Sequence, residues 1–158
     1  MNPVRNTMYT NVNPVVSNGV KIIIKNFQKK IPINPTRIKK TILRVLSSQN
    51  QARSGEITIS FVNEGKIKEL NKKYLGKDSP TDVLAFDISE PDKPNRLLAD
   101  IIICAEEALK NAKIFKTTVP YELNLYAVHG ILHILGFNDH TQKQAQLMRK
   151  LERKYVNT

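Results

Sequence analysis

One segment, residues 118–135, is apolar on nearly every side of the helix that its sequence predicts. Thr118 is a favourable N-cap, and Pro120 is tolerated in the first helical turn. A helix that is apolar all round has to be buried, so this one is expected to form the centre of the domain. It nevertheless carries His129 and His133, which lie one turn apart on the same face. Buried polar rings need partners, and a metal ion would supply one.

All three histidines of the 158-residue chain fall in one window, residues 129–140. Gly136 stands where a left-handed residue ends a helix, so the chain can turn back and bring His140 towards His129 and His133. Neutral imidazoles are the commonest protein metal ligands, and three protein ligands with one open position are typical of catalytic zinc. We therefore predict that His129, His133 and His140 bind one zinc ion per chain.

The residues between these histidines limit the reactions that the predicted zinc site can catalyse. A zinc ion held by three imidazoles lowers the pKa of bound water to about 7 and polarises phosphoryl or carbonyl oxygens, so hydrolysis is the expected reaction class. Asp139 is predicted to act in catalysis by orienting an imidazole or the metal-bound water. The alternative is that Asp139 is a turn residue or a charge at a helix start. Gly130 occupies the position at which His-Glu-x-x-His peptidases carry their general base, which disfavours a peptidase.

The rest of the sequence predicts a single α+β domain. Alternating or continuous apolar runs indicate strands, and apolar residues at helical spacing indicate helices. The strands are expected at 20–24, 56–62, 83–86 and 97–104, and the helices after Asn34-Pro35, at 64–74, 105–112 and 118–135, and from the capping box 141–144. We expect about four strands in a mixed sheet, packed with helices around the central histidine-bearing one.

The N-terminal residues differ in composition from the rest. Residues 1–18 are polar and rich in Asn, which predicts a disordered tail. The remainder, residues 19–158, is then a single metal-dependent hydrolase domain.

The charge is strongly basic and unevenly distributed. The net charge is +11, and residues 1–55 contain ten Lys or Arg residues and no acidic residue. Such a field favours a polyanion as partner, with nucleic acid first. The residues predicted to bind RNA lie mostly off the apolar face of the helix after Pro35, and they are Arg37, Lys39, Lys40 and Arg44. The alternative is an ordinary lysine-rich solvated surface.

Other classes of protein are disfavoured by the composition. The chain has one cysteine, Cys104, so no intrachain disulfide is possible. Its longest apolar runs are too short to span a bilayer, and no segment has the pattern of a secretory signal. These features predict a cytoplasmic protein without a membrane or disulfide partner.

Two long motifs resemble those of a known family. Residues 129–140, His-Gly-Ile-Leu-His-Ile-Leu-Gly-Phe-Asn-Asp-His, resemble the His-Gly-x-Leu-His-x-x-Gly-Tyr-Asp-His signature of the bacterial YbeY family. Residues 70–86, Leu-Asn-Lys-Lys-Tyr-Leu-Gly-Lys-Asp-Ser-Pro-Thr-Asp-Val-Leu-Ala-Phe, are similar to its Leu-Asn-x-x-Tyr-Arg-Gly-Lys-Asp-x-Pro-Thr-Asp-Val-Leu-Ser-Phe motif. Residues 98–101, Leu-Ala-Asp-Ile, resemble its Leu-Gly-Asp-Ile strand. The resemblance covers roughly residues 20–155.

The resemblance implies a YbeY-type, zincin-like fold and a zinc-dependent, single-strand-specific endoribonuclease. The family acts in ribosomal RNA maturation, notably at the 3′ end of the small-subunit RNA, and in ribosome quality control. Ribosomal RNA and the small ribosomal subunit are therefore the partners that the resemblance implies. Carried over by position, His129, His133 and His140 are the zinc ligands. RNA as the substrate agrees with the basic charge.

The chain departs from the family pattern at several positions. Leu75 stands where the family usually has an arginine thought to act in catalysis or phosphate binding, and leucine cannot stabilise phosphoryl charge. Lys77 is predicted to take a catalytic role in its place and Lys73 to contact RNA, although lysine lacks the bidentate fork of arginine. Smaller departures are Ala85 for a serine, Asp87 for a proline and Ala99 for a glycine.

One residue is also inserted in the histidine signature. Because of Asn138, His140 follows His133 by seven positions instead of the six of the family motif. Asn tolerates left-handed backbone conformations, so we expect the loop to absorb the extra residue and His140 to reach the metal.

Two other functions stay open. A ribosome-associated RNA-binding factor with a structural zinc and no catalytic activity is motivated by Leu75. A metal-dependent amidase or peptidase is less favoured, because Gly130 removes the usual base.

Overall fold

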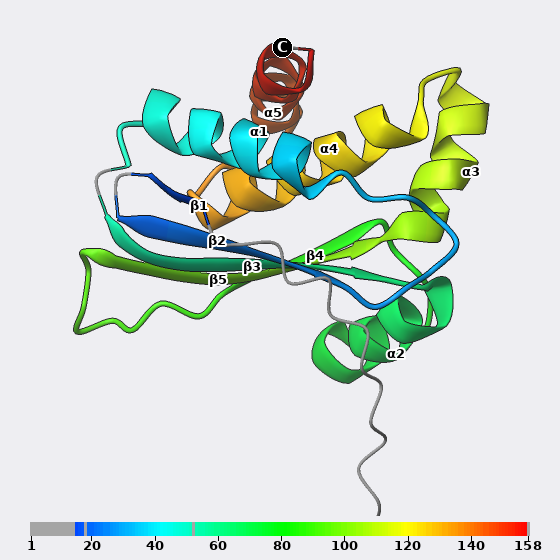
Figure 1. The fold of residues 1–158 in the computed structure, drawn as a ribbon, viewed down its shortest axis with the longest axis horizontal. Coiled ribbons are helices and arrows are strands. Elements are labelled where there is room, and N and C mark those ends of the chain that lie inside the picture. The colour runs from blue at the N-terminus through cyan, green and yellow to red at the C-terminus, as the bar shows by residue number, and fades with distance from the viewer. Residues whose placement is uncertain (1–14, 18, 52, 158) are drawn as a thin grey trace, which may run out of the picture.

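The computed structural model describes residues 15–17, 19–51 and 53–157. Along this part of the chain, five strands and five helices follow one another (Figure 1). They are β1 Val15–Ser17, β2 Val20–Asn26, α1 Pro35–Ser48, β3 Ser54–Val62, α2 Glu64–Leu75, β4 Val83–Asp87, β5 Arg96–Cys104, α3 Ala105–Phe115, α4 Val119–Ile134 and α5 Gln142–Val156. Each strand and helix predicted from the sequence is among them.

The strands form one mixed sheet in the order β1-β2-β3-β5-β4. β2, β3 and β5 run parallel, whereas β1 and β4 are antiparallel edge strands. The predicted α+β class with a mixed sheet is confirmed, and β1 is the strand beyond the four expected. It lies within residues 1–18, the segment predicted as a tail. The rest of that segment, residues 1–14 and 18, lies outside the described residues.

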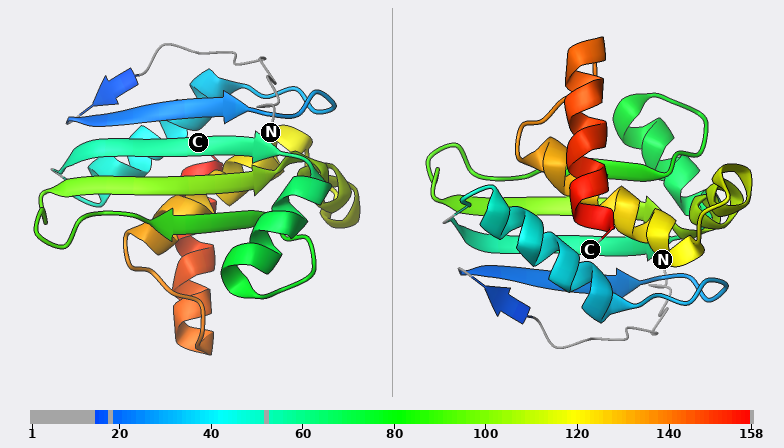
Figure 2. Two further views of the ribbon diagram at one scale, coloured as in Figure 1. Left: turned by 90° about the horizontal axis from the view of Figure 1, so that it is seen from below. Right: turned by 90° about the horizontal axis from the view of Figure 1, so that it is seen from above.

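The helices cover the two faces of the sheet unequally. α1, α4 and α5 lie over one face, and α2 lies against the other (Figures 1 and 2). The side chains of β3 explain the difference, because Ile57, Ile59 and Phe61 are fully buried towards the three helices. The residues between them are partly exposed on the opposite face. This alternation is the one expected of a half-buried strand.

The segment predicted as a buried helix is α4. It packs against α1, α3, α5, β4 and β5, and it lies between the sheet and α5 (Figure 2). The Thr118 hydroxyl accepts a hydrogen bond from the Tyr121 backbone N–H at 3.3 Å, as expected of an N-cap. Core residues of α4 such as Leu123, Val128 and Ile131 are at most 2% exposed. The helix is therefore held on most of its circumference.

Two further observations concern membrane-spanning and disulfide-bonded proteins, the classes that the composition disfavours. None of the described helices is long and apolar enough to cross a membrane. Cys104, at the end of β5, is a buried free thiol.

Candidate metal centre

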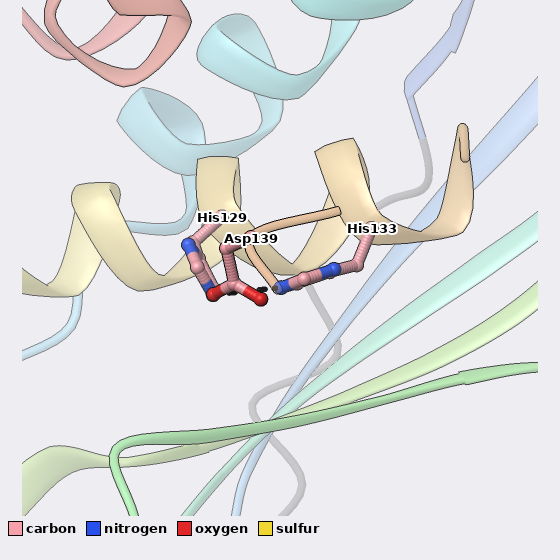
Figure 3. A group of neighbouring side chains, drawn as sticks. All are labelled: His129, His133 and Asp139. Carbon is pink, nitrogen blue, oxygen red and sulfur yellow. Dashed lines mark hydrogen bonds and ion pairs between the residues drawn. The ribbon is translucent and has the colours of Figure 1, made fainter. Parts of the chain in front are cut away.

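α4 brings His129 and His133 together in its last two turns. Their Nε2 atoms lie 2.9 Å apart, and the two rings meet edge to face with centroids 4.5 Å apart. The side chains are 26% and 28% exposed, so both rings stand at the edge of the core. Two imidazole nitrogens therefore point at one place below the helix (Figure 3).

The loop after α4 carries a carboxylate to the same place. Gly136 has a φ of +95°, a left-handed conformation that glycine adopts without strain, and there the chain reverses. Asp139 Oδ2 then lies 3.9 Å from His129 Nε2 and 3.7 Å from His133 Nε2 (Figure 3). The possible ligand atoms of the three residues all lie within 4.8 Å of one another.

These three donors fit a metal ion. Ligands bound at 2.0–2.1 Å to a tetrahedral zinc ion lie about 3.3 Å from one another. The three separations here, 2.9, 3.7 and 3.9 Å, bracket that value. Two imidazoles and one carboxylate are used by catalytic zinc sites and by non-haem iron sites. The donor set thus suits a divalent ion with open coordination positions.

The structure groups Asp139, rather than His140, with the two α4 histidines. The inserted Asn138 explains this, because it places Asp139 six residues after His133, the spacing at which the family motif has its third histidine. His140 comes one residue later and is exposed. It still lies close enough for its charge to contribute to lowering the pKa of His133. The role of His140 as a zinc ligand stays a prediction.

One of the two α4 histidines, His129, has a partner on its other ring nitrogen. His129 Nδ1 lies 2.6 Å from Glu152 Oε1, a carboxylate oxygen of α5. Such outer partners fix the tautomer and the orientation of metal-binding histidines.

The pKa values of the two histidines shift in opposite directions. Burial alone would lower the pKa of His129, but the hydrogen bond and charge of Glu152, with the charges of Asp82 and Asp139, raise it above its ordinary value. Burial and the neighbouring charge of His129 lower the pKa of His133. The pair therefore shares positive charge unequally, as expected for two interacting bases.

Glu152 and Asp82 belong to the surroundings of the centre, and the sequence analysis missed both. Glu152 is the only acidic residue of α5, and it lies on the buried side of a basic helix, which is a signal that the sequence does contain. Asp82 lies before β4 in the Pro-Thr-Asp-Val part of the second motif. Its Oδ1 accepts a hydrogen bond from the Val83 backbone N–H at 2.8 Å, and its carbonyl oxygen accepts one from the Cys104 N–H at 2.8 Å.

Gly130 is explained by packing rather than by chemistry. A Cβ atom at this position would lie 2.9 Å from Cγ2 of Ile101 on β5. The helix therefore approaches the sheet at the residue that follows His129. A glutamate at this position, the general base of His-Glu-x-x-His peptidases, would meet β5.

The residues around Leu75 are exposed. The Leu75 side chain is 54% exposed. Lys73 and Lys77 are also exposed, and Lys73 Nζ lies 5.1 Å from the centroid of the Tyr74 ring. Among the hydrogen bonds and ion pairs of the described residues, none joins Lys77 to the α4 histidines. The catalytic role of Lys77 and the RNA contact of Lys73 stay predictions.

The predicted basic face of α1 is only partly a surface. Arg37 and Lys40 are exposed, as expected. Lys39 is 2% exposed, and burial lowers its pKa, so its placement on an exposed face was wrong. Arg44 donates a hydrogen bond to the carbonyl oxygen of Tyr155 and ties α1 to α5. Helical periodicity did not reveal the contact of Arg44 because its partner, Tyr155, lies 111 residues further along the chain.

The chain is similar to known proteins over most of its length. The family model described as "Endoribonuclease YbeY" matches residues 23–158. A protein named Endoribonuclease YbeY from Carboxydothermus hydrogenoformans is 33% identical over 135 residues, covering 85% of this chain and 94% of that protein. The protein of the same name from Moorella thermoacetica is 37% identical over 131 residues, covering 75% of this chain and 83% of that protein.

A solved structure is also similar. The solution structure of TM1509 from Thermotoga maritima has a TM-score of 0.56 and 26% sequence identity, with 87% of each chain covered. It supports the arrangement of strands and helices described above. Since the family model spans most of the chain and relatives match at these identities, the chain belongs to the YbeY family.

Proposed function

We propose that this protein is a metal-dependent endoribonuclease whose metal ion is held by His129, His133 and Asp139. The main support is the convergence of these three donors within 4.8 Å, in a chain of the YbeY family. Relatives named Endoribonuclease YbeY indicate the reaction class, cleavage of RNA within the strand. Zinc is the proposed ion, one per chain, because two histidines and a carboxylate bind the zinc of several hydrolases.

The centre combines the chemistry of a bound metal ion with the effects of two carboxylates, Glu152 and Asp139. A divalent ion held there supplies Lewis-acid activation of a phosphoryl oxygen and a nucleophile near neutral pH. Glu152 occupies Nδ1 of His129, which leaves the Nε2 atom of this ring available to bind the ion. Asp139 adds one negative charge, and its side chain is 40% exposed, which leaves that side of the site open to a substrate.

Ribosomal RNA is the proposed substrate, at the 3′ end of the small-subunit RNA, and the small ribosomal subunit in the cytoplasm is the proposed partner. The net charge of +11 supports a polyanionic substrate. The family resemblance supports the choice among RNAs.

The test uses purified protein with its metal content measured. It is incubated with a single-stranded fragment of small-subunit ribosomal RNA, with the same fragment annealed to its complement, and with a peptide. We expect cleavage of the single strand alone and its loss on addition of a chelator. Cleavage that is insensitive to chelation, or cleavage of the peptide alone, would refute the proposal.

A second candidate function rests on Leu75. Because its exposed side chain replaces the family arginine, the protein could bind ribosomal RNA without cutting it. Leu75→Arg separates the two functions. If the arginine raises a measurable cleavage rate, the site is an enzyme weakened at Leu75. If both forms bind RNA, hold a metal ion and leave the RNA intact, the binding function is correct.

A further inference from the structure

Glu152 is placed unusually for a carboxylate in a basic helix. Its side chain is 14% exposed, on the side of α5 that also buries Met148 and Tyr155. Its neighbours include Arg149 and Arg153, which are exposed. Among the ion pairs of the described residues, however, Glu152 pairs with His129 and with no Lys or Arg.

Such a burial has to be compensated by a specific partner. Removing a carboxylate from water is unfavourable unless the carboxylate is paired and hydrogen-bonded. The 2.6 Å contact with His129 Nδ1 supplies that partner, as a charge-assisted hydrogen bond. The ring nitrogen donates its hydrogen, and the carboxylate oxygen accepts it.

The contact decides which nitrogen of His129 carries the hydrogen. With Nδ1–H donated to Glu152, the Nε2 atom keeps its lone pair and faces the Nε2 atom of His133 at 2.9 Å. This is the tautomer that binds a metal ion through Nε2. A neutral histidine without such a partner divides its population between two tautomers, and only one of them suits this geometry.

We propose that Glu152 is a positioning residue that fixes the tautomer and ring orientation of His129 and so raises the affinity of the centre for its metal ion. It acts from a different helix, so metal binding is coupled to the packing of α5 on α4. The proposal rests on the proposed metal centre and names a residue that determines its affinity.

The experiment compares wild type with Glu152→Gln and Glu152→Ala. Zinc affinity is measured by competition with a chelator, and the tautomer of His129 in the metal-free protein is read from its ¹⁵N chemical shifts. The matched control is Glu69→Gln, which removes the same charge from an exposed ion pair with Lys66 on α2. Metal-free stability is measured by thermal unfolding for every variant.

We expect zinc affinity to fall about 10–100-fold in Glu152→Gln and at least as far in Glu152→Ala, as is usual when an outer partner of a metal-binding histidine is lost. Glu69→Gln should keep the wild-type affinity. The ¹⁵N shifts should report Nδ1–H in the wild type and a mixture of tautomers in Glu152→Ala.

Three results would overturn the proposal. The first is a zinc affinity of the Glu152 variants within about twofold of the wild type. The second is a His129 tautomer in Glu152→Ala that is unchanged from the wild type. The third is a loss of affinity that only follows unfolding of the metal-free variants. Should Glu152→Ala fail to fold, the zinc affinity of Glu152→Gln still decides, because this variant keeps the shape of the side chain and removes its negative charge. Absence of RNA cleavage by the metal-loaded wild type would refute the proposed function and leave this inference standing, since neither readout uses RNA.

Discussion

At the scale of single residues, Asn138 decides which side chain joins the two α4 histidines. It moves His140 one position further from His133 and puts Asp139 at the six-residue spacing of the family motif. Replacing a neutral imidazole by a carboxylate lowers the net charge of the centre by one. An anionic ligand binds hard divalent ions more strongly and weakens the Lewis acidity of the bound ion.

Replacing each of the two candidate ligands by asparagine tests whether Asp139 or His140 binds the metal ion. Asp139→Asn should lower zinc affinity by more than the roughly 10–100-fold expected for an outer partner, because a direct ligand is lost. His140→Asn is the matched control and should change affinity by less than about threefold. Chelator competition measures both. If His140→Asn releases the metal and Asp139→Asn retains it, His140 is the third ligand.

The raised pKa of His129 predicts how metal binding depends on pH. Metal ligands must be deprotonated, so protons compete with the ion. Because the pKa of His129 lies above its ordinary 6.5, zinc affinity should begin to fall above pH 6.5 as the solution is acidified. In the metal-free protein the same shift stabilises the fold below pH 6.5, and this contribution is lost as pH rises through the folded-state pKa.

Zinc affinity measured by chelator competition between about pH 5 and about pH 8 checks this expectation. Glu152→Gln should move the onset to lower pH, because the contact that raises the pKa is removed. A wild-type affinity that stays constant until well below pH 6.5 would contradict the assignment of His129 as a ligand of raised pKa.

At the scale of elements, the approach of α4 to β5 fixes the height of the metal centre above the sheet. Gly130 permits this approach, since a Cβ atom there would lie 2.9 Å from Ile101 Cγ2. The Ile101 side chain is fully buried and branches next to the strand backbone, so it has little room to move.

Gly130→Ala should therefore destabilise the protein. Overpacking costs roughly 1–3 kcal/mol, and better helix propensity returns up to about 1 kcal/mol, so a net loss of about 1–2 kcal/mol is expected. Gly65→Ala on α2 is the matched control, because a Cβ atom there meets nothing closer than 3.6 Å. Denaturant unfolding of the metal-free protein measures both. Equal stability of the two variants would show that the α4–β5 contact is loose.

α5 has two sides with different expected roles. Its buried side carries Glu152 to the metal centre, and its exposed basic residues are Lys143, Arg149, Lys150, Arg153 and Lys154. Of the ion pairs in the described parts of the chain, none uses Arg149, Lys150 or Arg153. This side is therefore better suited to RNA phosphates than the α1 face predicted from the sequence, where Lys39 is buried.

The triple variant Arg149→Gln, Lys150→Gln, Arg153→Gln should weaken binding of single-stranded RNA. Each lost phosphate contact reduces the slope of log affinity against log salt by about 0.7, so a reduction of about 2 is expected. The control replaces Lys66, Lys93 and Lys110 by Gln, which removes the same charge from lysines already paired with glutamates. Filter binding at several salt concentrations measures the slopes. Equal slopes in the two triple variants would show that the basic residues of α5 form an ordinary solvated surface that does not bind RNA.

At the scale of the whole molecule, local patterns predicted the elements better than their contacts. Apolar periodicity located β2 to β5 and the five helices, and cap residues such as Thr118 and Thr141 located helix starts. β1 was missed because its pairing with β2 is a property of the sheet rather than of three residues.

In the metal centre too, sequence spacing predicts some residues, whereas others depend on contacts between distant parts of the chain. His129 and His133 follow from helical spacing, which is local. The placement of Asp139 beside them depends on how a loop closes, and the contact of Glu152 with His129 spans 23 positions. Long-range contacts of this kind have no periodic signature in one sequence.

The central claim is that the metal ion held by His129, His133 and Asp139 is required for RNA cleavage. The most direct measurement is a titration of metal-free protein with zinc, following cleavage of single-stranded ribosomal RNA at each addition. We predict no cleavage without metal and a rate that rises linearly to a plateau at one equivalent, with Asp139→Asn showing no such rise. Cleavage at full rate by the metal-free protein, or by the loaded Asp139→Asn variant, would contradict it.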